Sequence, residues 1–177
     1  MFECIDELKD GTLGYRSHVA YAAGCVAKEL HAGQVDKGGK DYFTSHLLPV
    51  AKYGHDWKEV TVGFLHDAAE DTDNTVEEVI DQVKQQLDEL CSVANDKPTE
   101  EEWDEIANAL HCLNHHNAPT REVYIEGISK NPLALKAKLN DLKSNMDISR
   151  IPNPTEKDLM RLERYKKEFA FLTARAR

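Results

Sequence analysis

Apolar residues recur at the spacing of a helix along most of this chain. Between Ser17 and Leu30 they fall on one helical face, at Val19, Ala22, Ala23, Val26 and Leu30. No run alternates between apolar and polar residues as a strand would, and no internal repeat or low-complexity segment is present. The 177 residues therefore predict an all-α fold. We expect one domain over residues 1–177, a compact bundle of about seven to nine helices.

Residues that cap helix N-termini indicate where the helices begin. Capping boxes are expected at Thr75–Glu78 and Thr99–Glu102. Pro132 follows Asn131 at the position where proline suits a first helical turn. The other expected starts are Thr44 or Ser45, about Lys58, Thr120 and Thr155. The segment 31–42 contains three glycines and is expected to be a loop, with His31 ending the preceding helix.

The charge balance disfavours nucleic acid as a partner. The net charge is −10, and between Asp67 and Glu105 the only basic residues are Lys84 and Lys97. Such a surface repels phosphate backbones. A small phosphorylated substrate remains compatible with it, because a bound metal and a few cations can override the global field inside a cleft.

Neither a membrane segment nor a secretory leader is expected. No apolar run approaches the roughly 20 residues that span a bilayer. The start MFECIDELKD is acidic and lacks the basic region of a signal peptide, so we expect a cytoplasmic protein. The cysteines lack CxxC spacing, which favours reduced thiols over a zinc or disulfide framework: Cys4, Cys25, Cys91 and Cys112.

The stretch VGFLHDAAEDT, residues 62–72, places charged residues on a segment that otherwise predicts a core helix from about Lys58 to Ala69. Residues four apart share a helical face, so Glu70 should lie above His66 and Asp71 above Asp67. His66 and Asp67 are about 100° apart around the axis and cannot fill the coordination sphere of a metal alone.

Two further residues complete a set of candidate metal ligands. His46 follows the glycine loop, and Asp141 lies between the apolar residues Leu139 and Leu142. Two imidazoles and two carboxylates without a thiolate suit Mn, Fe or Zn. A metal with open positions in such a shell supports hydrolysis. Each residue alone also fits a surface or core position, and the metal hypothesis depends on their joint occurrence.

Three stretches of the chain resemble a known enzyme family: HAGQVDKGGKDYFTSH, FLHDAAEDT and NPLALKAKLNDLKSNMD. The four candidate ligands, in that order and on three predicted helices, resemble the HD-domain metal-dependent phosphohydrolases. The Glu-Asp pair after the His-Asp pair narrows the resemblance to the RelA/SpoT-type hydrolase branch, which includes stand-alone small alarmone hydrolases. The resemblance extends over residues 18–165.

This resemblance implies a role for each matching residue. One divalent metal per chain, usually Mn²⁺ with Fe, Zn, Co or Mg as alternatives, would be held by His46, His66, Asp67 and Asp141. Glu70 and Asp71 would position and activate the attacking water. The nucleotide would contact Lys37, Asn145, Arg161 and Tyr165. In that family the reaction removes the 3′-pyrophosphate from (p)ppGpp.

The chain departs from the family pattern in the glycine loop. Asp36 stands where the alarmone hydrolases usually have an arginine, the loop is one residue shorter, and Leu47 replaces a proline. Arginine can stack on a purine and offset phosphate charge, whereas aspartate repels phosphate. A different nucleotide is therefore an alternative substrate.

Further alternatives come from outside the enzymes. A non-catalytic HD module that senses a nucleotide would lose ligands or the Glu-Asp pair, and a helical interaction module would carry its His-Asp pair by chance. The sequence is also compatible with a homo-oligomer. His115 and His116 are expected to be a solvated loop pair, because no partner lies at ligand spacing from them.

Overall fold

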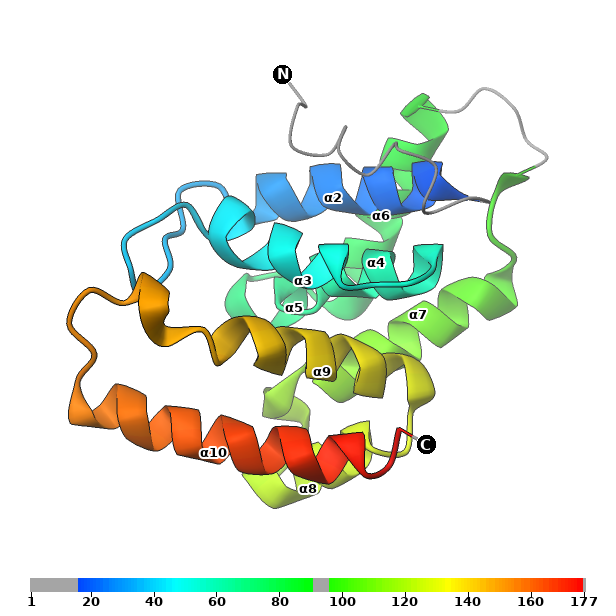
Figure 1. The fold of residues 1–177 in the computed structure, drawn as a ribbon. Coiled ribbons are helices and arrows are strands. Elements are labelled where there is room, and N and C mark those ends of the chain that lie inside the picture. The colour runs from blue at the N-terminus through cyan, green and yellow to red at the C-terminus, as the bar shows by residue number, and fades with distance from the viewer. Residues whose placement is uncertain (1–15, 91–95, 177) are drawn as a thin grey trace.

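The computed structural model describes residues 16–90 and 96–176, and within them the fold is helical (Figure 1). The α-helices are α2 (Ser17–Leu30), α3 (Leu48–Lys52), α4 (Trp57–Leu65), α5 (Ala68–Asp71), α6 (Val76–Leu90), α7 (Glu100–Leu113), α8 (Arg121–Ile128), α9 (Pro132–Asn145) and α10 (Glu156–Thr173). A π-helix, Phe43–Leu47, and two 3₁₀-helices, His115–Asn117 and Ile148–Arg150, complete the set. The described residues contain one isolated β-bridge, Val35 to Asp41, and no strand. The predicted all-α bundle is confirmed, with nine α-helical segments in the described residues.

Most of the expected helix starts are confirmed by their hydrogen bonds. Thr99 and Glu102 form a capping box, as do Thr155 and Asp158. The Asn131 side chain accepts from two amides of the first turn of α9. Each such cap stabilises its helix by about 1 kcal/mol, so these short local patterns set several boundaries of the bundle.

The start expected at Thr44 or Ser45 was wrong. The chain turns helical earlier, through a π-helical turn, and the Asp41 carboxylate accepts from the amide of Thr44 at 2.9 Å. Pro49 follows in α3. A proline ring clashes with the carbonyl four residues before it in an α-helix, and a wider turn relieves that clash. His46 lies within this π-turn.

The single helix expected from about Lys58 to Ala69 was also wrong. It begins at Trp57 after an Asp56 cap and is interrupted after Leu65, and α5 begins at Ala68. His66 Nδ1 donates to the carbonyl of Gly63 at 2.8 Å. A continuing helix would offer that carbonyl to the amide four residues later, so the histidine ring competes with the helix.

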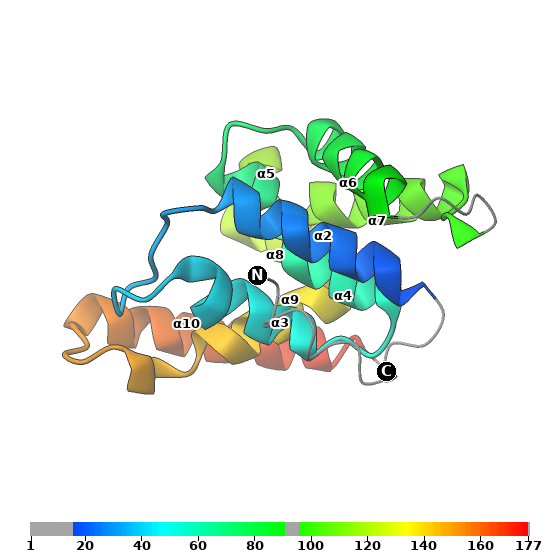
Figure 2. The same ribbon diagram turned by 90° about the horizontal axis from the view of Figure 1, so that it is seen from above.

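Helix α4 lies at the centre of the bundle. It packs against α2, α3, α7 and α9, and α10 packs on the outer side of α9. Figure 2 shows α2 and α4 between α6 and α7 on one side and α3, α9 and α10 on the other. A Cβ on Gly63 would lie 2.9 Å from the Cα of Ala51. Glycine therefore permits the close approach of α3 and α4 that places His46 beside His66.

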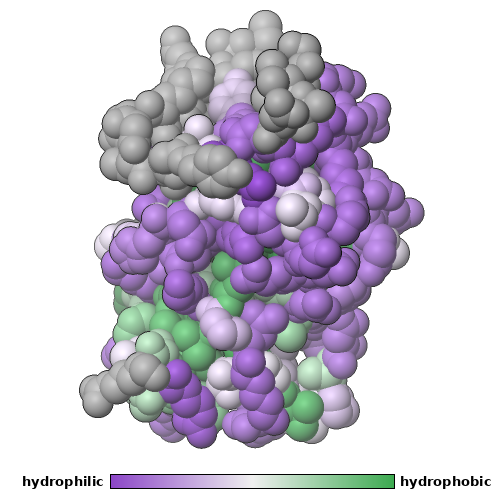
Figure 3. All heavy atoms as spheres, turned by 90° about the vertical axis from the view of Figure 1, so that its right-hand side faces the viewer, coloured by the Kyte–Doolittle hydropathy of each residue, from purple (hydrophilic) through white to green (hydrophobic). Residues whose placement is uncertain are grey.

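Polar and apolar residues are unevenly distributed over the surface. Figure 3 shows a face that is hydrophilic across its middle and right-hand side, with apolar residues gathered at the lower left. In the described part of the chain, no helix combines the length and the apolar character that crossing a membrane requires. Cys25 and Cys112 are partly buried free thiols, and Cys4 and Cys91 lie outside the described residues.

Candidate metal and substrate site

Four side chains from three parts of the fold converge beneath a pocket. His46 comes from the π-turn, His66 and Asp67 from the break between α4 and α5, and Asp141 from α9. The Nε2 atoms of His46 and His66 lie 3.3 Å apart. Asp67 Oδ2 is 3.0 Å from His66 Nε2 and 3.4 Å from His46 Nε2. Asp141 Oδ1 is 3.3 Å and 3.7 Å from the His46 and His66 nitrogens, respectively.

The outer ring nitrogens of both histidines are held by neighbouring groups. Because a carbonyl only accepts, His66 Nδ1 must donate to Gly63, and the neutral ring then presents the Nε2 lone pair to the centre. His46 Nδ1 hydrogen-bonds to Ser144 Oγ at 3.2 Å. Metal-ligating histidines are typically oriented by such contacts.

The carboxylates of Asp67 and Asp141 are also held by hydrogen bonds from residues outside the centre. Tyr42 donates its hydroxyl to Asp67 Oδ2 at 2.6 Å. Asp141 accepts from Lys138 Nζ at 2.7 Å and from Asn145 Nδ2 at 2.5 Å. The site is therefore preorganised, with each acidic and basic member restrained by a partner outside the centre.

The electrostatics of the centre favour a positive charge between the two carboxylates. Burial alone would lower the pKa of His46 and His66, but the nearby Asp67 and Asp141 outweigh it and raise both pKa values. Burial likewise disfavours charged carboxylates, yet their cationic neighbours hold the pKa of Asp67 and Asp141 well below the usual range. Protons on the imidazoles or a metal cation can supply this charge.

The donor set suits a divalent metal. The ligand atoms of His46, His66 and Asp67 all lie within 4.8 Å of one another, so these three residues form a group that could hold an ion. Asp141 approaches both imidazoles but also accepts hydrogen bonds from Lys138 and Asn145. Nitrogen and oxygen donors without sulfur fit Mn, Fe, Co or Zn.

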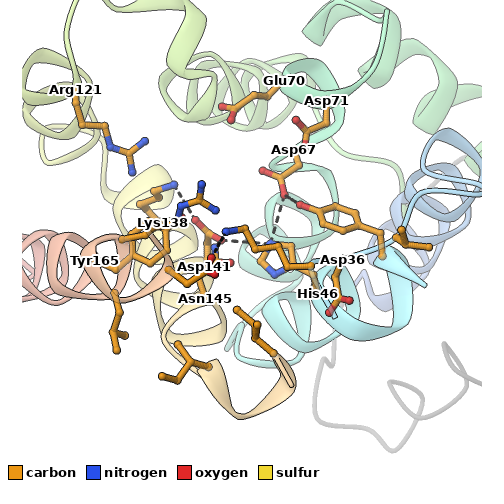
Figure 4. Close-up of a pocket in the computed structure, with 18 residues that line it drawn as sticks. Asp36, His46, Asp67, Glu70, Asp71, Arg121, Lys138, Asp141, Asn145 and Tyr165 are labelled. Atoms are coloured by element: carbon orange, nitrogen blue, oxygen red, sulfur yellow. Dashed lines mark hydrogen bonds and ion pairs between the residues drawn. The ribbon is translucent and has the colours of Figure 1, made fainter. Parts of the chain in front are cut away.

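Above this centre is a pocket of about 490 Å³. Its lining includes all four residues expected to contact the nucleotide, Lys37, Asn145, Arg161 and Tyr165. Figure 4 shows Asp67, Glu70 and Asp71 on one side of the pocket and Arg121, Lys138 and Tyr165 on the other. Lys37 Nζ pairs with Asp158 at 2.5 Å, which joins the glycine loop to the first turn of α10.

The acid pair lies on α5 beside the metal ligands. The amide of Asp71 bonds to the carbonyl of Asp67 at 2.8 Å, so Asp71 still lies one turn after Asp67. The expected stacking of Glu70 on His66 along one helix does not hold, because the helix breaks between them. Burial, followed by the charges of Asp67 and Glu70, raises the pKa of Asp71.

The sequence-based interpretation missed two cations of the pocket. Lys138 is buried against Asp141, whose charge outweighs the effect of burial and raises the pKa of Lys138. Arg121, the first residue of α8, makes two hydrogen bonds to Glu168, at 2.9 and 2.8 Å. Lys138 could have been suspected from its place three residues before Asp141 on α9, whereas the local sequence around Arg121 gives no such signal.

The loop aspartate has a local structural role. Asp36 Oδ1 accepts from the amides of Gly38 at 2.8 Å and Lys40 at 2.9 Å, which closes the turn at the loop tip. His31 ends α2 as expected, and its Nδ1 contacts Gln34 Oε1 at 2.7 Å. Gln34 in turn donates to the carbonyl of Asp71 at 3.1 Å, so the loop also contacts α5.

His115 and His116 are exposed, as expected of a solvated pair, but His115 also has a partner that the sequence did not indicate. Its Nδ1 lies 2.7 Å from Glu70 Oε1, and its amide donates to Glu70 Oε2 at 3.0 Å. The separation of 45 positions along the chain hides this pairing from any local pattern.

Comparison with protein families and with curated proteins gave no match. No protein-family model matches the chain, and no curated protein matches it. A function for this chain must therefore be inferred from its residues and their geometry.

Proposed function

We propose that this chain is a metal-dependent phosphohydrolase of the HD type that acts on a small phosphorylated nucleotide, with (p)ppGpp as the favoured substrate. One observation carries the proposal: two imidazole nitrogens and two carboxylates converge below a pocket that also presents an acid pair. The resemblance of the three sequence stretches supports the nucleotide and the 3′-pyrophosphate as the reacting group.

The metal would be held by His46, His66, Asp67 and Asp141. A bound divalent cation supplies a water of lowered pKa and offsets charge on phosphate oxygens. Of the possible ions, Mn²⁺ is the one that the family resemblance favours.

The protein's own groups would divide the remaining work. Glu70 and Asp71 orient the attacking water, and Glu70 accepts its proton. Lys138 and Arg121 face these acids across the pocket and would offset the phosphate charge.

The nucleoside would lie toward the outer part of the pocket. Val35, Ile151 and Leu162 line the pocket together with Tyr165, and such side chains suit a base or sugar. Arg161 lies one helical turn before Tyr165 and could bind a second phosphate.

A different nucleotide is the second candidate substrate. The observation that favours it is the glycine loop, where Asp36 lines the pocket and Lys37 is paired with Asp158. A substrate with fewer phosphates would meet less repulsion there than one with two diphosphate groups.

A nucleotide screen with Mn²⁺ tests the proposal. Purified protein is incubated with ppGpp and a panel of nucleoside mono-, di- and triphosphates, and products are separated by chromatography. Release of pyrophosphate from ppGpp supports the alarmone substrate, and release of phosphate from another nucleotide supports the second candidate. Protein that carries Mn²⁺ and hydrolyses none of them contradicts the proposed function.

A further inference from the structure

The carboxylate of Glu70 is held from outside the pocket by a single residue of a distant turn. Among the described residues, His115 contacts both carboxylate oxygens: the backbone amide donates to Oε2 at 3.0 Å, and the ring Nδ1 lies 2.7 Å from Oε1. A carboxylate offers about four lone-pair positions, so acceptor capacity remains for a water in the pocket. Glu70 is thus fixed in orientation without being saturated.

The turn that presents His115 is itself anchored. Asn114 donates from Nδ2 to the carbonyl of Ala69 at 3.0 Å, which attaches the turn to α5 beside Glu70. Its Oδ1 accepts from the amide of His116 at 3.0 Å, and Asn117 Nδ2 donates to the carbonyl of His111 at 3.1 Å. These bonds fix the 3₁₀-turn against α5 and α7, so His115 has a defined position.

The ring of His115 also lies against a buried aromatic ring. The ring of Tyr124 lies 6.3 Å away at 77°, an edge-to-face arrangement. Tyr124 is buried, and its hydroxyl donates to the carbonyl of Leu113 at 2.7 Å. The ring orientation that points Nδ1 at Glu70 is therefore supported from a second helix, α8.

We propose that His115 is a positioning residue for the hydrolytic reaction, and this inference rests on the proposed function. His115 keeps the Glu70 carboxylate in the orientation in which it receives the proton of the attacking water. An unrestrained glutamate samples many rotamers, and a small misplacement of a proton acceptor is costly to the rate. The contribution of His115 should therefore appear in kcat.

Three variants test this role. His115→Ala removes the ring that contacts Glu70, and His115→Asn keeps a nitrogen near the position of Nδ1. His116→Ala is the matched control, because this exposed neighbour stacks on His115 with ring centroids 4.0 Å apart and has no contact with Glu70 in the described residues. Steady-state kinetics are measured with Mn²⁺ on the best substrate of the nucleotide screen, alongside bound-metal analysis and thermal melting.

The expected result is a loss of about tenfold or more in kcat for His115→Ala, with KM and bound metal unchanged. The loss stays below the ~10²–10⁴-fold that removing a general base costs. His115→Asn recovers most of the rate, and His116→Ala resembles the wild type. An unchanged or increased kcat in His115→Ala would overturn the proposal, and an increase would mean that the contact restrains Glu70 away from the water.

A double-mutant cycle separates positioning from a merely structural effect. If His115 acts through Glu70, His115→Ala has little further effect on kcat once Glu70→Gln is present. Equal losses in both backgrounds would overturn the proposal. Failure of the proposed function is distinguishable, because the wild type itself would then show no turnover. The contact is checked independently by NMR: Glu70→Ala should shift the His115 amide and Nδ1 resonances, and unchanged resonances would also count against the proposal.

Discussion

The Nε2 atoms of His46 and His66 face each other at 3.3 Å, although His46 lies in the π-turn and His66 in the break between α4 and α5. Two neutral imidazoles cannot both present lone pairs to one another at that distance without repulsion. A proton or a metal ion between them removes the conflict, and the adjacent carboxylates of Asp67 and Asp141 favour either cation.

One divalent metal per chain is expected, and His66→Ala should weaken its binding strongly. Loss of a ligand should cost at least the ~10–100-fold that loss of an outer hydrogen-bond partner costs. Elemental analysis after reconstitution with Mn²⁺ and dialysis provides the measurement. His55→Ala is the control, because His55 is exposed and precedes α4, at the opposite end of that helix from the break. Equal metal content in the two variants would refute the site.

Gly63→Ala should destabilise the protein and reduce metal binding together. The added Cβ would lie 2.9 Å from the Cα and 3.2 Å from the N of Ala51, which is backbone and cannot rotate away. Such overpacking typically lowers the free energy of unfolding by about 1–3 kcal/mol. Pushing α3 away from α4 would also separate His46 from His66.

Gly127→Ala supplies the control for that change. Its Cβ would meet nothing within 4 Å, and it lies within α8, where alanine stabilises a helix by up to about 1 kcal/mol. Denaturant melts and Mn²⁺ titrations of both variants provide the comparison. Similar stabilities would show that α3 and α4 do not need the close approach.

The parts of the fold that follow local rules could be predicted from the sequence. A capping box such as Thr99–Glu102 involves residues three apart, so its geometry is complete within one turn. The break after Leu65 could not be predicted in this way, because the apolar spacing continues across it. It involves the ring of His66 competing for a helical carbonyl, a contact that periodicity does not register.

In the candidate site, too, some features could be predicted from local sequence and others depend on contacts between distant residues. Ligand types can be read from the chain, because imidazole and carboxylate have distinct chemistry wherever they lie. The groups that orient them are harder to find: Tyr42 reaches Asp67 across 25 positions, and His115 reaches Glu70 across 45. Only the packing of α5 against the 3₁₀-turn and the glycine loop brings these partners together.

Metal-free protein should lose stability as the pH rises above about 6.5, the ordinary pKa of histidine. Folding raises the pKa of His46 and His66. Their protonation therefore stabilises the fold fully below the unfolded pKa of about 6.5, and this contribution is lost as the pH rises through the raised values. Asp67 and Asp141 have lowered pKa values, so their ionised carboxylates also stabilise the fold. This contribution is lost only as the pH falls below about 4, outside this pH range.

Melting temperatures in EDTA across this pH range test the effect. His66→Gln should flatten the decline, whereas His55→Ala should not. Saturating Mn²⁺ should also flatten it, because metal binding requires neutral imidazoles and strengthens as protons leave. A metal-free protein whose stability is constant or rises over this range would contradict the raised pKa values.

Glu70→Gln should retain the metal and lose most turnover. The substitution keeps the size of the side chain but removes its ability to accept a proton, and a general base typically contributes ~10²–10⁴-fold. Rates and bound Mn²⁺ are measured on the same preparation. Turnover close to that of the wild type would remove Glu70 from the reaction.

Asp36 tests how the glycine loop selects its substrate, and Asp36→Asn is the informative change. The carboxylate closes the loop turn by accepting from the amides of Gly38 and Lys40, and an amide oxygen can accept the same bonds. Replacement by arginine would lose them and confound charge with loop structure. Asp36→Asn removes only the negative charge from the pocket lining.

We expect Asp36→Asn to lower KM for ppGpp several-fold and to leave kcat unchanged. A like charge near a phosphate, partly screened, is worth on the order of 1 kcal/mol, and a residue that acts on binding alone changes KM. Asp41→Asn is the control, because Asp41 is an exposed cap of the π-turn and is absent from the pocket lining. Steady-state kinetics at two salt concentrations give the measurement, since screening should shrink the difference. If KM is the same for both variants and the wild type, the charge of Asp36 does not reach the substrate, and the loop acts through Lys37 and its pairing with Asp158 instead.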